Sequence, residues 1–324
     1  MRKRTRGADY YRQHLLAGER VALARAITAV ENDSADARAV FKVINGQVGR
    51  AHVIGFTGAP GAGKSSLVNS FTHEMRKRNN SVGVIAVDPS SPFTGGAILG
   101  DRIRMSDHGG DDGVFVRSLA SRGHLGGLSR ATARVVDIMD AAGKDVIIVE
   151  TVGTGQSEVE IMEIAQTVVV VCAPGLGDEI QAVKAGILEI ANILVVNKFD
   201  LPHAERTARH LKDAVELGPQ RDWPVPIMNT IATDGEGIAE LADMMDRHYQ
   251  SIDQSERENA AVRRMRKLVA TAAARQLNAW LDRPGADALD ALCEAVLRGE
   301  MEMEEAGAKA LDLAANRSGG ADRP

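Results

Sequence analysis

Eight consecutive residues match a phosphate-binding loop, and they carry the clearest chemistry in this chain. They lie between the apolar run His52 to Thr57 and a helical pattern from Ser65 to Arg78, and they are Gly58, Ala59, Pro60, Gly61, Ala62, Gly63, Lys64 and Ser65. Glycines let backbone N–H groups wrap phosphates at the positive end of a helix, while Lys64 reaches the β and γ oxygens and the Ser65 hydroxyl ligates Mg²⁺. An ordinary glycine-rich turn would not need lysine and serine directly after the last glycine. We therefore predict that this loop, together with Ser66, binds a nucleoside triphosphate.

A second motif, directly after the apolar run Ile193 to Val196, indicates which base is bound. Its residues are Asn197, Lys198, Phe199 and Asp200. The Asp200 carboxylate can accept hydrogen bonds from the ring N–H and the exocyclic amine of guanine, whereas adenine offers no such pair of donors. The Lys198 stem can lie along the ring face. A surface turn capping the next helix is the alternative, but the position after a strand and downstream of a phosphate loop favours GTP or GDP.

The elements that must position these loops are β-rich runs alternating with helical patterns over residues 51–250. The runs are Val53 to Thr57, Val82 to Asp88, Asp145 to Glu150, Thr167 to Cys172 and Ile193 to Asn197. Because parallel strands need crossover helices, this alternation predicts an α/β fold: a P-loop NTPase with a mostly parallel sheet covered by helices. Ligands collect at the carboxyl ends of such strands, where the candidate residues fall. A further strand is expected near Val225 to Met228.

Helical patterns flank this domain on both sides. Tyr10 to Glu31 has apolar residues at helical spacing and predicts a helical N-terminal extension within residues 1–50. Beyond residue 250, one apolar stripe faces a side rich in Arg and Glu; its members are Val262, Met265, Val269, Ala273, Leu277 and Trp280. Pro284 and Gly285 should end that helix. We expect residues 251–324 to form a helical arm with a disordered tail from Ser318.

The composition argues against several other classes of protein. With 324 residues, 44% hydrophobic and 26% charged, the chain has room for one large domain with appendages or for two domains. No apolar run is long enough to cross a bilayer, and none follows the basic start Met1 to Arg6, so we expect a cytoplasmic protein without a membrane partner. Aromatic residues make up 3% and are not interleaved with Lys and Arg, so no nucleic-acid partner is expected. Two cysteines and scattered histidines indicate neither a disulfide framework nor a zinc or nickel site.

Two longer segments between the phosphate loop and the guanine motif carry a resemblance to a known family. They are Val87 to Met105 and Glu150 to Glu158. With them, the chain resembles the G-protein chaperones of adenosylcobalamin-dependent acyl-CoA mutases, the group that contains the bacterial methylmalonyl-CoA mutase chaperone and its human mitochondrial counterpart. The resemblance runs from about Leu15 through Asp200. It implies a GTPase, converting GTP and water to GDP and phosphate, that gates cofactor loading or protection of such a mutase and is slow until the mutase stimulates it.

The resemblance also implies the roles of particular residues. A last guanine-contacting loop should follow the strand near Val225 to Met228, where the chain has Thr230, Ile231 and Ala232 in place of the more usual Ser-Ala pair, and the Ala232 N–H is expected to bond to the guanine oxygen. Asp88, Asp101 and Glu150 correspond to acidic residues around magnesium and the γ-phosphate, and with Lys64 and Gly153 they form the expected catalytic set. Because Mg²⁺ takes one or two carboxylates beside phosphate oxygens and waters, not all three acids need be direct ligands.

Two loops are implied to act as switches. Gly153 is expected to give its N–H to the γ-phosphate from a loop that contains Gln156, which orders with GTP and relaxes after hydrolysis. A further switch segment, Ala173 to Lys184, would signal to the mutase through Asp178 and Lys184. The family also uses its C-terminal region to dimerise, so a homodimer is expected, with an arm folded back on its own domain as the alternative.

Simpler interpretations stay open for several of these residues. Asp88 would cap the turn before Pro89, Glu150 would face solvent, Asp101 would pair with Arg102 or Arg104, and Asp178 would cap a helix. At the level of function, the alternative is a P-loop kinase that transfers phosphate to a small acceptor or a transport protein, as older names in this family describe. A nickel-enzyme maturation GTPase is a third class, and it would be expected to carry a Cys/His metal site.

Overall fold

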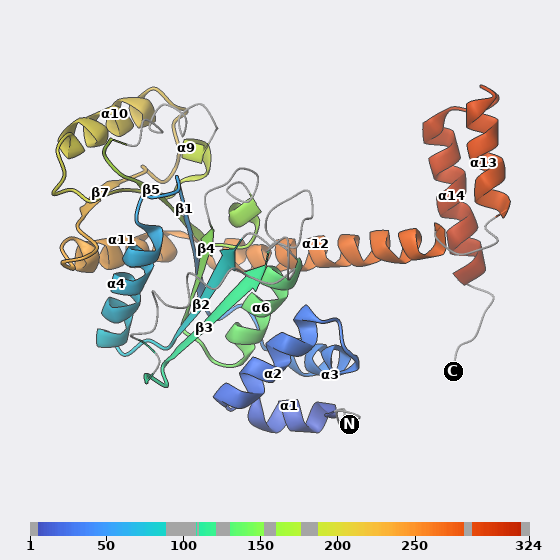
Figure 1. Ribbon diagram of the computed structural model, residues 1–324, viewed down its shortest axis with the longest axis horizontal. Helices are drawn as coiled ribbons and strands as arrows, with labels where there is room; N and C mark the ends of the chain where they lie inside the picture. The colour runs from blue at the N-terminus through green and yellow to red at the C-terminus, as the bar shows by residue number, and fades with distance from the viewer. Residues whose placement is uncertain are drawn as a thin grey trace. The chain divides into compact units, whose positions relative to one another are not determined.

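Short runs of β-branched and apolar residues form the strands of a parallel sheet in the computed structural model. The structure describes residues 6–88, 108, 110–120, 130–151, 160–175, 187–281 and 287–318. The strands are β1 (His52–Thr57), β2 (Val82–Asp88), β3 (Val114–Ala120), β4 (Val146–Thr151), β5 (Thr167–Cys172), β6 (Ile193–Asn197) and β7 (Ile227–Thr230). Across the sheet their order is β3-β2-β4-β1-β5-β6-β7, and each neighbouring pair is parallel (Figure 1). The predicted α/β fold with a parallel sheet is confirmed.

Helices cover both faces of this sheet. Those that follow the strands are α4 (Lys64–Lys77), α6 (Arg130–Ala141), the 3-10 turn η2 (Ile161–Glu163), α9 (Ile187–Ile190), α10 (Ala204–Glu216) and α11 (Ile238–Ser251). Helices α4 and α11 lie side by side and share one core with the central strands, which includes Phe56, Leu67, Phe71, Val169 and Leu241. Every residue of β1, β4, β5 and β6 is buried, because helices cover the strands on both sides. This explains why these strands show no polar alternation.

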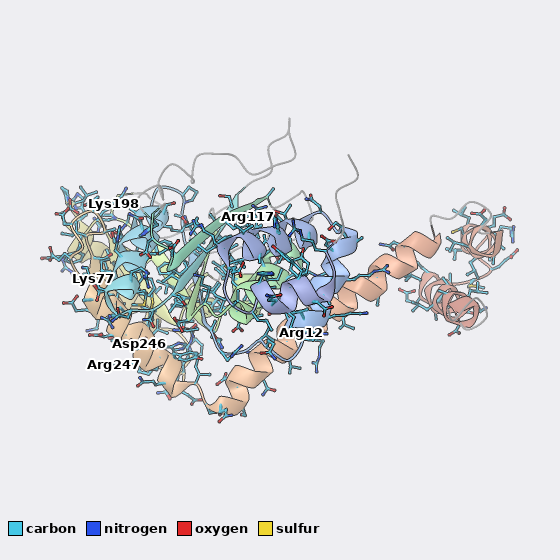
Figure 2. The ribbon with its side chains drawn as sticks, turned by 90° about the horizontal axis from the view of Figure 1, so that it is seen from below. Arg12, Lys77, Arg117, Lys198, Asp246 and Arg247 are labelled. Carbon is cyan, nitrogen blue, oxygen red and sulfur yellow. The ribbon has the colours of Figure 1, made fainter. Side chains whose placement is uncertain are left out.

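Two strands differ from the sequence-based expectation. β3 was not predicted: its residues are only partly buried at the sheet edge, and Arg117 interrupts its apolar pattern. That side chain lies beside the N-terminal helices and forms an ion pair with Glu31 (Figure 2). β7 begins at Ile227 rather than Val225, because Pro226 has no N–H to pair and contributes only its carbonyl, which accepts from the Leu194 N–H at 2.9 Å.

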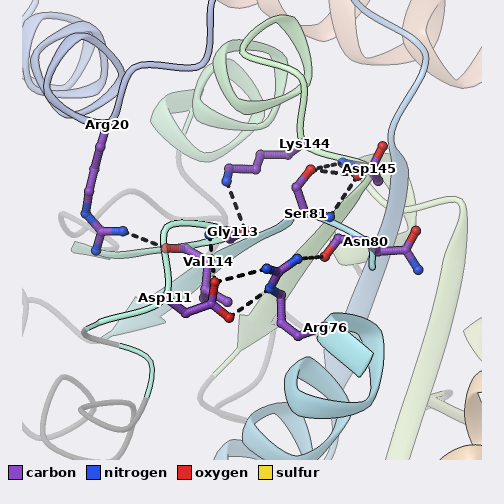
Figure 3. Close-up of polar contacts among 9 residues, drawn as sticks. All are labelled: Arg20, Arg76, Asn80, Ser81, Asp111, Gly113, Val114, Lys144 and Asp145. Atoms are coloured by element: carbon purple, nitrogen blue, oxygen red, sulfur yellow. Dashed lines mark hydrogen bonds and ion pairs between the residues drawn. The ribbon is translucent and has the colours of Figure 1, made fainter. Parts of the chain in front are cut away.

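A polar cluster fixes the starts of β2, β3 and β4, at the edge of the sheet away from the phosphate loop (Figure 3). Arg76 donates two hydrogen bonds to Asp111, at 2.8 and 3.1 Å, and Lys144 donates to the Gly113 carbonyl at 3.0 Å. The bond from Arg76 holds the pKa of Asp111 below its usual value, and burial lowers the pKa of Lys144. The cluster anchors the turn that leads into the edge strand β3.

The N-terminal extension consists of three helices. They are α1 (Ala8–His14), α2 (Arg20–Glu31) and α3 (Ala35–Ile44), and α2 and α3 pack on α6. The chain turns at Gly18, whose φ is 75°, so α1 and α2 are separate helices, and Val21 at the start of α2 is 57% exposed. Asp140 of α6 then accepts hydrogen bonds from the backbone N–H groups of residues 49–51, which fixes the segment entering β1.

The chain divides into two units, Met1–Arg264 and Met265–Pro324. Helix α12 (Gln254–Leu281) contains their boundary, and α13 (Asp287–Leu297) and α14 (Met303–Ser318) contact each other within the second unit. The predicted helix break at Pro284 and Gly285 and the predicted disorder from residue 319 onward lie outside the described residues, as does the side chain of Trp280. Helix α14 continues to Ser318 itself. None of the helices in the described part of the chain is long and apolar enough to span a bilayer.

Candidate nucleotide-binding site

The phosphate loop folds into a cradle that requires glycine at two positions. Gly58 follows β1 with φ 134°, and an added Cβ would collide with the carbonyl oxygen of Val171. Gly63 has φ 86° and a Cβ there would collide with the Asn197 side chain. Gly63 is also the N-cap of α4, and as a glycine it has no side chain with which to cap that helix end. The positive end of α4 therefore suits an anionic ligand such as phosphate.

Lys64 lies inside this cradle. Its Nζ donates hydrogen bonds to the carbonyl oxygens of Gly58 at 2.8 Å and Ala59 at 2.9 Å, and the residue is buried. Lys198 holds the other side of the loop, since its Nζ donates to the Gly61 carbonyl at 2.9 Å. The backbone of Lys198, which is labelled in Figure 2, adopts a left-handed conformation with a φ of 57°. Two ammonium groups are thus fixed at the loop, where they favour a highly charged phosphate chain.

Ser65 and Glu150 meet at the start of α4. The Ser65 hydroxyl donates to Glu150 Oε1 at 2.6 Å, and Glu150, on β4, is only 5% exposed. A buried carboxylate beside a serine hydroxyl at the phosphate loop is a donor set that suits Mg²⁺, which prefers hard oxygen ligands. The interpretation of Glu150 as a solvent-facing side chain does not agree with this burial. Among the described residues, no group of three or more His, Cys, Asp and Glu gathers in a metal-binding arrangement.

The remaining residues of the predicted phosphate and switch set are only partly described. Asp88 ends β2, whose Ala86 and Val87 pair with Glu150 and Thr151 of β4, so its backbone reaches the same edge of the sheet as Glu150. Its side chain is not described. The other predicted residues in this group lie outside the described part of the chain: Asp101, Gly153, Gln156, Asp178 and Lys184. Their roles stay predictions.

Asn197 joins the guanine motif to both neighbouring loops. It is buried at the end of β6, its Nδ2 donates to the Ala62 carbonyl at 3.0 Å, and its Oδ1 accepts from Thr230 Oγ1 and the Ala232 N–H, both at 3.2 Å. The phosphate loop, the guanine motif and the loop after β7 therefore form one unit. Asp200, two residues beyond Lys198, is exposed and open to a ligand.

Sequence reasoning missed two hydrogen bonds that shape this site. Thr151 donates a hydrogen bond to Thr57 Oγ1 at 3.0 Å where β4 and β1 end, and Ser70 of α4 bonds to the loop after β7. Thr151 lies in a segment that carries the family resemblance, but Thr57 and Ser70 belong to no motif. These hydrogen bonds can be identified only in the folded structure, because each one joins residues that are far apart in the sequence.

A parallel sheet whose strand β1 leads through a phosphate loop into helix α4 defines a P-loop nucleoside triphosphatase. Residues 23–282 match the family of methylmalonyl-CoA mutase-associated GTPases called MeaB, and the chain belongs to that family. The family expected from the sequence motifs is therefore confirmed.

Individual relatives agree with this assignment. The chain is 50% identical over 247 residues to a putative GTPase of Pyrococcus horikoshii, covering 75% of this chain and 78% of that protein. It is 33% identical over 267 residues to the mouse mitochondrial methylmalonic aciduria type A homolog, covering 76% of this chain and 64% of that protein. A crystal structure of an LAO/AO transport system kinase has the same fold, with a TM-score of 0.69 and 23% identity over 94% of this chain and 97% of that one.

Proposed function

We propose that this protein binds and hydrolyses GTP in order to gate cofactor loading or protection of an adenosylcobalamin-dependent acyl-CoA mutase. One observation carries the guanine-nucleotide part: the Asn197 side chain bonds to both the phosphate loop and the loop after β7, so the predicted phosphate and base contacts belong to one site. The family's association with methylmalonyl-CoA mutase supports the partner. The protein would act in the cytoplasm as a homodimer joined through residues 251–324.

In this proposal each predicted residue has a defined task. The backbone of residues 58–65, with Ser66, holds the phosphates, and Lys64 turns from the loop carbonyls to the β and γ oxygens. Magnesium would be held by Ser65 and by carboxylates drawn from Asp88, Asp101 and Glu150, directly or through water, and it would neutralise charge on the β- and γ-phosphates. Gly153 would donate its N–H to the γ-phosphate. At the base, Asp200 reads the ring N–H and amine of guanine, and the Ala232 N–H reads its oxygen.

Coupling to a mutase would act in both directions. If the GTP-bound and GDP-bound forms differ in affinity for the mutase, the mutase must change the relative affinities for GTP and GDP by the same factor. The proposed switch residues Gln156, Asp178 and Lys184 would transmit that difference. Hydrolysis without the partner is slow, because no arginine in a recognised motif supplies the charge that stabilises phosphoryl transfer.

Phosphate release, measured with and without a cobalamin-dependent acyl-CoA mutase from the same source, tests the proposal. We expect the mutase to accelerate release and to bind with a nucleotide-dependent affinity. Lys184→Ala should lose this stimulation and keep the basal rate. Lys212→Ala removes the same charge from an exposed position on α10, where Lys212 pairs with Glu216 at 3.9 Å, and should keep both. Unchanged rates and no complex in either nucleotide state would contradict the chaperone function, while phosphate appearing on a small acceptor would favour the kinase alternative.

A further inference from the structure

Helix α4 carries a serine that reaches the loop expected to read the base. The Ser70 hydroxyl donates a hydrogen bond of 2.5 Å to the carbonyl oxygen of Ala232. Ala232 is 4% exposed, and its own N–H donates to Asn197 Oδ1 at 3.2 Å. Both polar backbone groups of Ala232 are therefore bonded to side chains, one from α4 and one from the end of β6. The same helix that begins at the phosphate loop thus also holds the loop after β7.

The surroundings of Ser70 make this a rigid connection. Helices α4 and α11 lie side by side (Figure 1), and at the end of α4 Arg78 donates to Asp243 Oδ1 at 2.7 Å and to the Ala239 carbonyl at 3.0 Å. The loop between β7 and α11 closes on itself through a hydrogen bond from the Ile231 N–H to the Glu236 carbonyl at 3.1 Å. Because the two ends of this short loop are bonded to each other, the Ser70 bond to the Ala232 carbonyl sets the position of Ala232 between them.

We propose that Ser70 is a positioning residue for base specificity, which acts by fixing Ala232 against the 6-oxygen of a bound guanine. The inference rests on the proposed GTP-binding function and deepens it. The Ala232 N–H donates to Asn197 Oδ1 in the structure and would change to the 6-oxygen when guanine binds, while Ser70 holds the Ala232 carbonyl on α4 in both cases. Ser70 itself belongs to no nucleotide-binding motif in this chain, so its effect passes through Ala232.

The chemistry of the purines separates this role from that of Asp200. Guanine and hypoxanthine both carry a 6-oxygen, which accepts a hydrogen bond, whereas adenine carries a 6-amine, which donates. Hypoxanthine lacks the 2-amine that Asp200 is expected to bind. A defect at Ala232 must therefore weaken guanine and hypoxanthine nucleotides by the same factor. A defect at Asp200 must change the ratio between them.

Calorimetric titration of the full-length protein with GDP, inosine diphosphate and ADP tests this role. Ser70→Ala should weaken binding of GDP and inosine diphosphate equally, by about five- to tenfold, which is the scale of one lost hydrogen bond. Binding of ADP should not change, because the phosphate contacts stay intact. Alanine is the best helix former, so α4 should persist and the melting temperature should stay near that of the wild type. Ser70→Thr keeps the hydroxyl and should restore binding.

Thr72 provides the matched control on the same helix. Its hydroxyl donates to the Val68 carbonyl at 2.7 Å, a bond of the same kind that stays within α4. Thr72→Val should bind all three nucleotides as the wild type does.

Three outcomes would overturn the role of Ser70: unchanged GDP binding in Ser70→Ala, an equal loss for ADP, or an altered ratio of GDP to inosine diphosphate affinity. A wild-type protein that does not prefer GDP to ADP would overturn the proposed function and this inference with it. A wild-type preference for GDP that Ser70→Ala leaves intact would overturn this inference alone.

Discussion

At the scale of single residues, three side chains hold the phosphate loop by its carbonyl groups. Lys64 bonds to the carbonyls of Gly58 and Ala59, Lys198 to that of Gly61, and Asn197 to that of Ala62. In a trans peptide the N–H and C=O groups point in opposite directions. Side chains that occupy the carbonyls therefore leave the other side of the loop, with its N–H groups, for an anion.

Lys64→Ala should abolish GTP hydrolysis and weaken binding of the triphosphate more than that of the diphosphate. The ammonium group is expected to leave the loop carbonyls for the β- and γ-oxygens, so its loss removes charge where phosphoryl transfer needs it. We expect phosphate release to fall by about two orders of magnitude or more. Titration with GTP and GDP gives the two affinities, with Lys212→Ala as the control. A variant that hydrolyses GTP at the wild-type rate would exclude this loop as the active site.

Asp200→Asn should exchange guanine preference for xanthine preference. The carboxylate is expected to accept two hydrogen bonds from guanine, whereas an amide offers one acceptor and one donor, which match the ring N–H and the 2-oxygen of xanthine. GDP affinity should fall by about a hundredfold or more, because the amide keeps only a neutral bond to the ring N–H and sets its own N–H donor against the 2-amine of guanine. Calorimetry with GDP and xanthosine diphosphate measures both changes. Asp213→Asn, at an exposed position on α10, is the control, and a parallel loss in both variants would argue against base reading by Asp200.

Residue types predicted the phosphate loop and the guanine motif, but they could not predict how the two are joined. Asn197 was expected to contact the nucleotide, and in the structure its side chain bonds to Ala62, Thr230 and Ala232. Local patterns contain no information on such partners, because each bond joins segments that are distant in sequence. For the same reason, the sequence did not predict the bond from Ser70 to Ala232.

At the scale of elements, a buried polar chain ties α11 to the sheet at the edge where β1 and β5 begin. His52 Nε2 lies 2.8 Å from Thr167 Oγ1, which lies 2.9 Å from His248 Nδ1 of α11. Tyr249 stacks on His52 with ring centroids 4.2 Å apart, and Trp223 meets the His248 ring edge-on at 4.9 Å. These contacts fasten the helix that ends where the chain turns into α12.

The hydrogen-bonded series of His52, Thr167 and His248 should make the folding stability of the protein depend on pH in mildly acidic solution. Burial lowers the pKa of His248 from 6.5 to about 4, so the folded protein keeps this ring neutral while the unfolded chain takes up a proton near pH 6.5. The unfolded state then binds more protons between these values, and stability present above pH 6.5 is lost as the pH falls toward 4. The full difference corresponds to about 3 kcal/mol of unfolding free energy.

Denaturant unfolding at pH 7 and pH 4.5 measures this loss. His248→Asn keeps a polar atom near the Nδ1 position and removes the titration, so its stability should change less between the two pH values than that of the wild type. His210→Asn, at an exposed position on α10, should behave as the wild type. An equal acid sensitivity in the wild type and in His248→Asn would contradict the assignment.

Among the elements, the central strands were predictable, whereas one edge strand, β3, was not predicted and the other, β7, begins two residues later than expected. β5 and β6 are continuous β-branched and apolar runs, because helices cover both faces, and the sequence placed their bounds correctly. β3 and β7 lie at the two edges of the sheet, where partial burial permits Arg117 in one strand and Pro226 just before the other. In the N-terminal extension, the apolar residues of Tyr10 to Glu31 keep a helical spacing across the turn at Gly18, so their pattern does not show where α1 ends and α2 begins.

At the scale of the whole molecule, the proposed homodimer depends on one face of α12. Val262, Met265 and Val269 follow one another at helical spacing, and all three are exposed, Val269 to 61%. An apolar stripe of this kind on a long helix gains free energy when it is buried against another surface. A two-fold symmetric partner would bury the same stripe from both copies.

We therefore expect the full-length protein to be a dimer at tens of micromolar, and a chain that ends at Gln250 to be a monomer. Light scattering gives both masses. Val269→Glu should shift the full-length protein toward the monomer, because a charge in the stripe would have to be buried without a partner. Ala274→Glu adds the same charge at an exposed α12 position outside the stripe and should leave the dimer intact. A full-length chain that stays monomeric, or equal dissociation in both variants, would exclude α12 as the dimer interface and leave the nucleotide site unaffected.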